Sequence, residues 1–127
     1  MAGTATVTTT DAARRFKKYS IAWVSTAGGA VSANAFQVVA GLIHTVKIVP
    51  GAGGVAPTTL YDILLNDADT VDLLNARGGD CSATAGEILQ FDPPLFVPLG
   101  TTLDLVVANA GASKEGRVDV CIEAVSN

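Results

Sequence analysis

Apolar and polar residues alternate with a period of two along most of this 127-residue chain. In the clearest run, residues 117–125, the inward positions are Val118, Val120, Ile122 and Ala124, and the outward ones are Arg117, Asp119, Cys121 and Glu123. Such alternation is typical of a strand with one buried face. Further strands are predicted for residues 18–25, 44–50, 60–66 and 102–109, with short ones near 31–40, 86–91 and 94–97. Only residues 70–76 have a pattern that allows a helical turn.

Glycine- and proline-rich clusters separate these segments, as in "PGAGGVAP" (50–57) and "NAGASKEG" (109–116). About eight short strands divided by turns predict an all-β fold, an antiparallel two-sheet sandwich with a jelly-roll-like order. A closed barrel is the second choice. Pro93 and Pro94 confine their segment to an edge strand or a bend. In "KYSIAWVS" (18–25), Tyr19, Ile21 and Trp23 share one face and are predicted to lie in the core.

The size of the chain, 12.9 kDa, fits one domain that needs no disulfide or metal for its core. We expect an extended N-terminal arm over residues 1–17 and a β-sandwich domain over residues 18–127. Only 16% of the residues are charged, and the mean hydropathy is +0.41. This shortage of charge predicts a homo-oligomer that covers part of its surface. No apolar run suits a membrane helix or a secretory signal, so we expect synthesis in the cytoplasm and no membrane partner.

The charge of the chain is unevenly distributed. Residues 1–20 hold four basic residues against Asp11, a net of +3, while the remainder holds four basic and eleven acidic residues, a net of −7. The candidate partner-binding residues of the arm are Arg14, Arg15, Lys17 and Lys18. They form either a solvated strand edge or a docking element for an acidic surface. No aromatic or basic stripe continues the patch, so nucleic acid is not an expected partner.

Two features invite a chemical interpretation. His44 is the only histidine, and no acid or nucleophile lies at motif spacing from it, so a packed or interface residue is favoured over a general base. Asp67, Asp69 and Asp72 favour turn formation, with a weak cation site as the alternative. The usual catalytic motifs are missing. We therefore expect a protein that is not an enzyme, with no catalytic residue, metal ligand or cofactor.

The two cysteines, Cys81 and Cys121, are expected to be free thiols, with a structural disulfide as the alternative. Two thiols and one distant histidine also make no four-ligand zinc set.

A family resemblance extends this interpretation. The segment "KYSIAWVSTAGGAVSANAF…IHTVKIVPGAGGVAPTTLYDILLNDADTVDLLNARG", about residues 18–80, resembles small virion proteins of tailed bacteriophages. In those proteins a Y-x-I-x-W strand, a glycine turn, a V-K-x-x-P strand end and a P-T-x-L-Y-D-[IV]-x-L-x-D-x-D hairpin follow in that order.

The resemblance implies a structural role in the virion, as a decoration or cement protein on the capsid surface. The implied partners are the phage major capsid protein and further copies of this chain, with a trimer as the expected number. The alternative is a tail- or baseplate-associated module that binds a receptor or glycan. Synthesis in the host bacterial cytoplasm is expected in either case.

Overall fold

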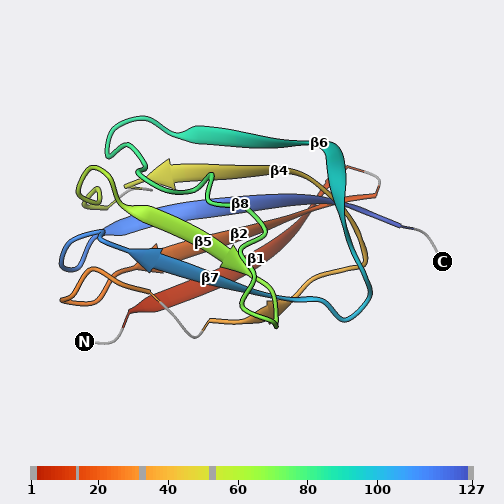
Figure 1. The fold of residues 1–127 in the computed structure, drawn as a ribbon, viewed down its shortest axis with the longest axis horizontal. Helices are drawn as coiled ribbons and strands as arrows, with labels where there is room; N and C mark the ends of the chain where they lie inside the picture. The colour runs from red at the N-terminus through yellow and green to blue at the C-terminus, as the bar shows by residue number, and fades with distance from the viewer. Residues whose placement is uncertain (1–2, 14, 32–33, 52–53, 126–127) are drawn as a thin grey trace.

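The protein is built from eight strands in two antiparallel sheets (Figure 1). The computed structural model describes residues 3–13, 15–31, 34–51 and 54–125. The strands are β1 (Thr4–Ala13), β2 (Phe16–Val24), β3 (Phe36–Gln37), β4 (Gly41–Pro50), β5 (Asp62–Asn66), β6 (Glu87–Val97), β7 (Thr102–Ala108) and β8 (Glu115–Ala124). Within the described residues there is no helix, and so none that is long and apolar enough to cross a membrane. The predicted all-β, two-sheet class is confirmed.

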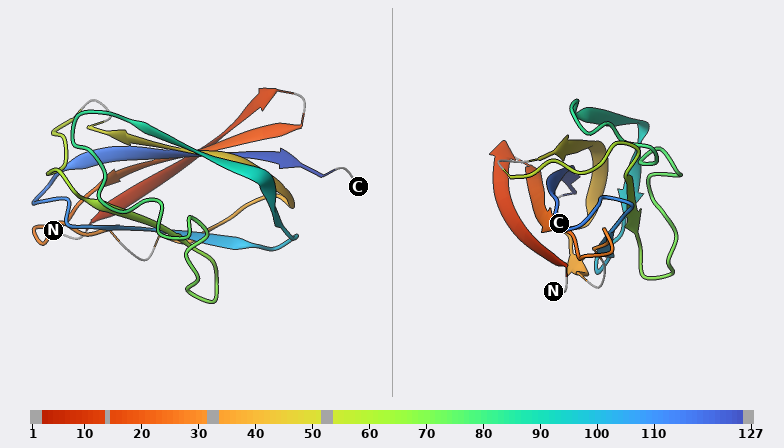
Figure 2. Two further views of the ribbon diagram at one scale, coloured as in Figure 1. Left: turned by 45° about the horizontal axis from the view of Figure 1, so that its top comes forward. Right: turned by 90° about the vertical axis from the view of Figure 1, so that its left-hand side faces the viewer.

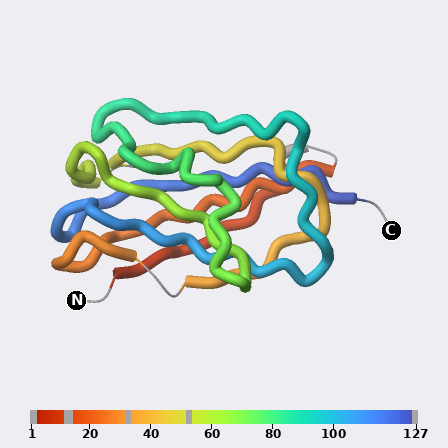
Figure 3. The backbone as a smooth tube through the Cα atoms, viewed as in Figure 1, coloured from red at the N-terminus to blue at the C-terminus, as the bar shows by residue number. Residues whose placement is uncertain are grey.

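The larger sheet has the order β1-β2-β8-β4-β6, and the smaller one has the order β3-β7-β5. Figures 1 and 2 show β5 and β7 as a second layer over one face of the larger sheet. From β4 onward the chain changes sheets at every connection, as the tube in Figure 3 lets the reader follow. Apart from the β1–β2 hairpin, neighbouring strands are therefore not consecutive in the sequence, and β4 lies between β6 and β8.

The core lies between the two sheets and consists of the inward rows that the period-two pattern predicts. Tyr19, Ile21 and Trp23 are buried, as predicted for β2. The Trp23 ring lies 5.9 Å from the ring of Tyr61, which precedes β5. On its other side the indole packs directly on Gly116, where a Cβ atom would collide with the ring. Glycine at this position is thus required for the tryptophan to fit.

The extended N-terminal arm is not confirmed. Thr4–Ala13 forms strand β1, which is hydrogen-bonded antiparallel along β2, with Thr4 opposite Val24 and Asp11 opposite Lys17. The boundary expected after residue 17 falls inside β2, which begins at Phe16. The segment is polar because an edge strand packs only one row of side chains, here Ala5 and Val7, against the core. It belongs to the sheet rather than projecting from it.

Two further expectations change in detail. The short strands near 86–91 and 94–97 are one strand, β6, whose register jumps from Gln90 to Leu95. The four residues between these, with Pro93 and Pro94, bulge out of the ladder, and β6 is an edge strand, as its prolines predict. Residues 70–76 contain hydrogen-bonded turns and no helix.

We predict that Trp23→Ala lowers the free energy of unfolding by about 3–5 kcal/mol, because it leaves a cavity between the two sheets. The measurement is urea or thermal unfolding followed by circular dichroism. The control is Ala22→Ser, an exposed position on the opposite face of the same strand, which should unfold like the parent. A Trp23→Ala protein as stable as the parent would contradict this assignment of the core.

Candidate functional site: the open face of the five-stranded sheet

Within the described residues, no second layer of strands covers the outer face of the larger sheet (Figure 2). Its rows follow from the strand registers, because directly opposed residues share a face. One row runs Thr8–Ser20–Asp119–Lys47–Ile88, and the next runs Thr10–Lys18–Cys121–Thr45–Gln90. Apart from Lys18, the β1 and β2 residues of these two rows are therefore threonine and serine.

An ion pair lies at the centre of this face. The side chain of Asp119 is only 8% exposed although it points outward, and Arg117 Nε donates to both of its carboxylate oxygens at 3.1 and 3.2 Å. Lys47 and Ser20 stand opposite Asp119 on the two neighbouring strands. The outward position agrees with the sequence pattern, but the burial does not, because the pattern contains no information on neighbouring strands.

A second polar pair lies toward the end of the same face. His44 Nε2 is 2.9 Å from Glu123 Oε1, and both side chains are about one-third exposed. The register of β4 shifts between Ile43 and Thr45 in both of its ladders, so His44 occupies a bulge. The Phe16 ring packs 5.5 Å from the imidazole. The bulge therefore presents a histidine held by a carboxylate from β8 and an aromatic ring from β2.

An open hollow of about 300 Å³ adjoins this pair. Its lining consists of His44, Thr45, Gln90, Phe91, Asp92 and Pro94. One face of the Phe91 ring is occupied by the guanidinium of Arg77, 4.6 Å from the ring centre. A histidine positioned by a carboxylate can accept or donate a proton, but within the described chain no hydroxyl or thiol is hydrogen-bonded to His44. The geometry suits binding of a polar group better than nucleophilic chemistry.

Sequence reasoning left His44 without a partner, and the structure supplies Glu123. The two residues are 79 positions apart and meet only because β4 and β8 are neighbours. Period-two patterning places Glu123 on an outward face, which was the one available signal. It does not specify which strand lies beside it.

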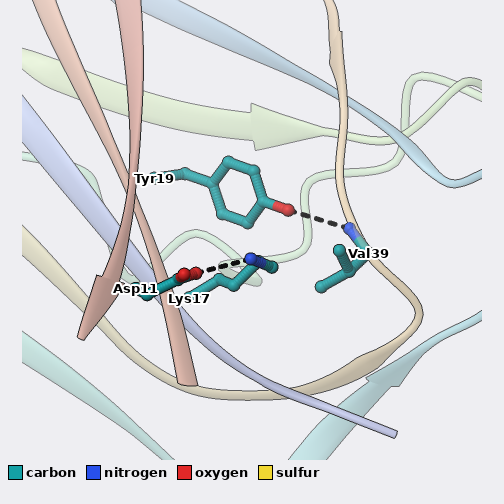
Figure 4. A network of polar contacts seen from close by, with 4 residues as sticks. All are labelled: Asp11, Lys17, Tyr19 and Val39. Carbon is teal, nitrogen blue, oxygen red and sulfur yellow. Dashed lines mark hydrogen bonds and ion pairs between the residues drawn. The ribbon is translucent and has the colours of Figure 1, made fainter. Parts of the chain in front are cut away.

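The four basic candidate residues of the expected arm differ in their surroundings. Arg14 lies outside the described residues. Arg15 is exposed in the turn between β1 and β2 and accepts a backbone hydrogen bond from Ala124. Lys17 pairs with Asp11 at 2.5 Å (Figure 4), and this hydrogen bond raises the pKa of the lysine. Lys18 lies on the open face opposite Cys121. Of these residues, Lys18 is the one placed on the open face, with Arg15 in the turn that adjoins it.

The acidic stretch after β5 serves as turn architecture. Asp67 Oδ1 accepts the backbone N–H groups of Asp69 and Val71 at 2.9 and 3.0 Å. Asp72 accepts three more, including that of Leu65 at 3.1 Å. The predicted turn role is confirmed for Asp67 and Asp72. Within the described ranges, no three His, Cys, Asp or Glu side chains converge as a metal-binding group.

Both cysteines are free, as predicted. Burial raises the pKa of the Cys81 thiol to about 12, with the charge of Glu87 adding to the effect. Cys81 Sγ donates to the Gly78 carbonyl at 3.1 Å. Burial also raises the pKa of Cys121, while the nearby Lys18 ammonium lowers it in part. Cys121 is less buried and lies on the open face.

Comparison with known proteins adds no relative: no family model, curated protein or solved structure matches this chain.

We predict that the two thiols differ in reactivity. Because the thiolate is the reacting form, Cys81 in the folded protein should resist alkylation by iodoacetamide at pH 8, where its thiol stays protonated. Cys121 should react faster, and both should react at similar rates in denaturant. Peptide mass spectrometry of a labelling time course measures this. Equal labelling of the two cysteines in the folded protein would contradict the burial of Cys81.

Proposed function

We propose that this chain is a structural protein of a tailed-phage virion, a decoration or cement protein that binds the assembled capsid and stabilises it. The observation that carries the proposal is the strand order of the two sheets. In a jelly roll, the first, eighth, third and sixth strands form one sheet, and the second, seventh, fourth and fifth form the other. Jelly rolls are common among viral capsid proteins and lectins.

The order supports a jelly roll if β1 is an added strand and β2 counts as the first. The larger sheet then reads first, eighth, third, sixth in β2-β8-β4-β6, and the smaller one reads second, seventh, fourth in β3-β7-β5. The fifth strand corresponds to residues 70–81, which join the edge of β5 through the bridge Asn66↔Asp72 and lie beside it through Tyr61↔Cys81. The backbone hydrogen bonds of this segment are those of turns and isolated bridges, and they do not form a regular ladder.

Because one fold serves many functions, the proposal also needs a suitable surface. The open face offers threonine and serine side chains on β1 and β2 and Lys18 at one end, with Arg15 in the adjoining turn. A protein that docks such a face on the assembled shell, and not on free subunits, stabilises the shell by mass action. Repeated copies on a lattice turn weak contacts into avidity.

The sequence motifs shared with small phage virion proteins lie in the core and in a turn of this fold. This placement supports a structural role for those motifs. Tyr19, Ile21 and Trp23 of the Y-x-I-x-W motif form the inward row of β2. The aspartates of the "DILLNDAD" stretch begin β5 and close the turn after it. Homo-oligomerisation remains part of the proposal. The trimer implied by the resemblance stays a prediction.

The tail- or baseplate-associated alternative is favoured by one observation, the hollow beside His44, whose aromatic, amide and carboxylate lining is of a kind that binds sugars. Stacking of Arg77 on Phe91 occupies one ring face that a sugar would use. We therefore rank this function second.

We predict that the protein co-sediments with assembled capsids at a fixed ratio of copies per capsid subunit. It should not bind unassembled capsid protein, and the decorated capsids should resist heat better than bare ones. Sucrose-gradient sedimentation with quantified gel bands measures the ratio. Absence from capsids, together with binding to host-cell glycans or to tails, would support the alternative instead.

We predict that Arg15→Ser combined with Lys18→Ser weakens capsid binding and reduces its dependence on salt, with little change in the melting temperature. Exposed charge contacts contribute on the order of 0–1 kcal/mol each and are screened by salt. The comparison variant is Lys47→Ser with Lys114→Ser, which removes the same charge from the middle of the open face and from the turn before β8. Equal loss in both proteins would show that docking is not localised at the hairpin end.

A further inference from the structure

The four outer edges of the two sheets are not equally protected. A free sheet edge exposes backbone N–H and C=O groups and is a template for pairing with another strand, so proteins shorten, bend, cover or charge such edges. Three of the four edges here carry such protection, and β1 does not.

The smaller sheet has two protected edges. At one edge, β3 has only two residues. At the other, β5 is covered by the segment that follows it. Leu73 N donates to the Leu65 carbonyl, and Ile63 N donates to the Gly78 carbonyl, both at 2.8 Å. No length of backbone suitable for pairing is left on this sheet within the described chain.

The β6 edge of the larger sheet is protected in a different way. Its middle carries the four-residue bulge with Pro93 and Pro94, and proline has no N–H to donate. On its straight part, Arg77 Nη1 donates to the Gln90 carbonyl at 2.8 Å and so occupies an edge acceptor. These features leave β6 only short uninterrupted stretches of backbone for pairing with a second strand.

The β1 edge has none of these devices. Thr4–Ala13 is ten residues long with no proline or glycine, and its one irregularity falls between Asp11 and Ala13. No described backbone group in it is hydrogen-bonded outside the β1–β2 pair. Its single charge, Asp11, is paired with Lys17 of the same hairpin (Figure 4). Figure 2 (right) shows β1 as the outermost strand, with β2 on its inner side and no drawn strand on its outer side.

We propose that β1 pairs edge to edge with β1 of a second copy of this chain, antiparallel about a two-fold axis, to form a dimer with one continuous ten-stranded sheet. The occupant is a second copy because the pairing is self-compatible. Among the described strands of that copy, only β1 offers a free edge. Pairing of like edges closes at two subunits and leaves no edge for further growth.

The sequence of β1 accepts this pairing without conflict. Directly opposed residues of an antiparallel pair point to the same face of the sheet. In two identical strands related by a two-fold axis, one residue therefore lies opposite its own copy, and the axis passes between these two residues. Centred on Thr8, Thr6 faces Thr10 of the other copy, and Val7 faces Thr9. Asp11 then faces Ala5, so no like charges meet. Thr–Thr pairs stabilise neighbouring strands, and the half-buried Val7 gains cover.

The dimer differs from the trimer that the resemblance implies. In a three-fold ring built by edge pairing, β1 of each copy would pair with a different strand of the next copy. The described strands other than β1 offer no free edge for this pairing. The inference concerns the free protein and stands or falls independently of capsid binding.

The test is sedimentation equilibrium of the free protein from 1 to 100 μM, a range chosen on the order of a moderate-affinity dimer. We expect a dimer of twice 12.9 kDa that dissociates on dilution. Thr6→Lys with Thr10→Lys sets like charges opposite each other and should raise the dissociation constant about tenfold or more. The matched control is Ile88→Lys with Gln90→Lys, at exposed positions of β6 on the same face, which should leave the dimer intact.

Hydrogen exchange of the unmodified protein gives a second readout that needs no variant. Amide protection within residues 4–11 should rise with protein concentration while that of β6 stays constant. A monomer at every concentration, a trimer, or equal weakening by the two lysine pairs would overturn the proposal.

Discussion

The burial of two facing rows of apolar side chains is the constraint on which the rest of this structure depends. The inward rows of β2 and β8 meet those of β5 and β7, and Trp23 spans the space between Gly116 and Tyr61. Each fully buried aliphatic side chain contributes roughly 1.5–3 kcal/mol, against a net domain stability of about 5–15 kcal/mol. Few positions in these rows can therefore change without loss of the fold.

Fixing the inward rows also determines what lies outside. Alternate residues of every strand must point away from the core, so the outer face of the larger sheet is assembled from positions that the core does not constrain. Asp119, His44 and Glu123 occupy such positions. His44 and Glu123 pair across β4 and β8, and Asp119 pairs with Arg117 of its own strand. The position of the open face thus follows from the core geometry. The residue types on that face are not constrained by the core and can be those that a binding partner requires.

The sequence predicts the inward rows because their period-two signal is local, and for the same reason it predicts the turns made by Asp67 and Asp72. It cannot predict the His44–Glu123 pair. That contact depends on the neighbour relation of β4 and β8 and on a one-residue bulge, and neither leaves a local trace. The buried state of Asp119 escapes prediction likewise, because the period-two pattern marks its position only as outward-facing.

The misassigned N-terminal segment shows where composition misleads. Four threonines alternate with Ala5, Val7, Thr9 and Asp11, a pattern too polar for a strand buried on one face but adequate for an edge. Threonine favours extended backbone. The backbone hydrogen bonds to β2 stabilise this strand where side-chain burial contributes little. The proposed pairing of two β1 edges would join two open faces into one surface, with a basic hairpin end at each extremity. Docking one end would then raise the effective concentration of the other, so contacts that are individually weak would hold the pair on a repeating lattice.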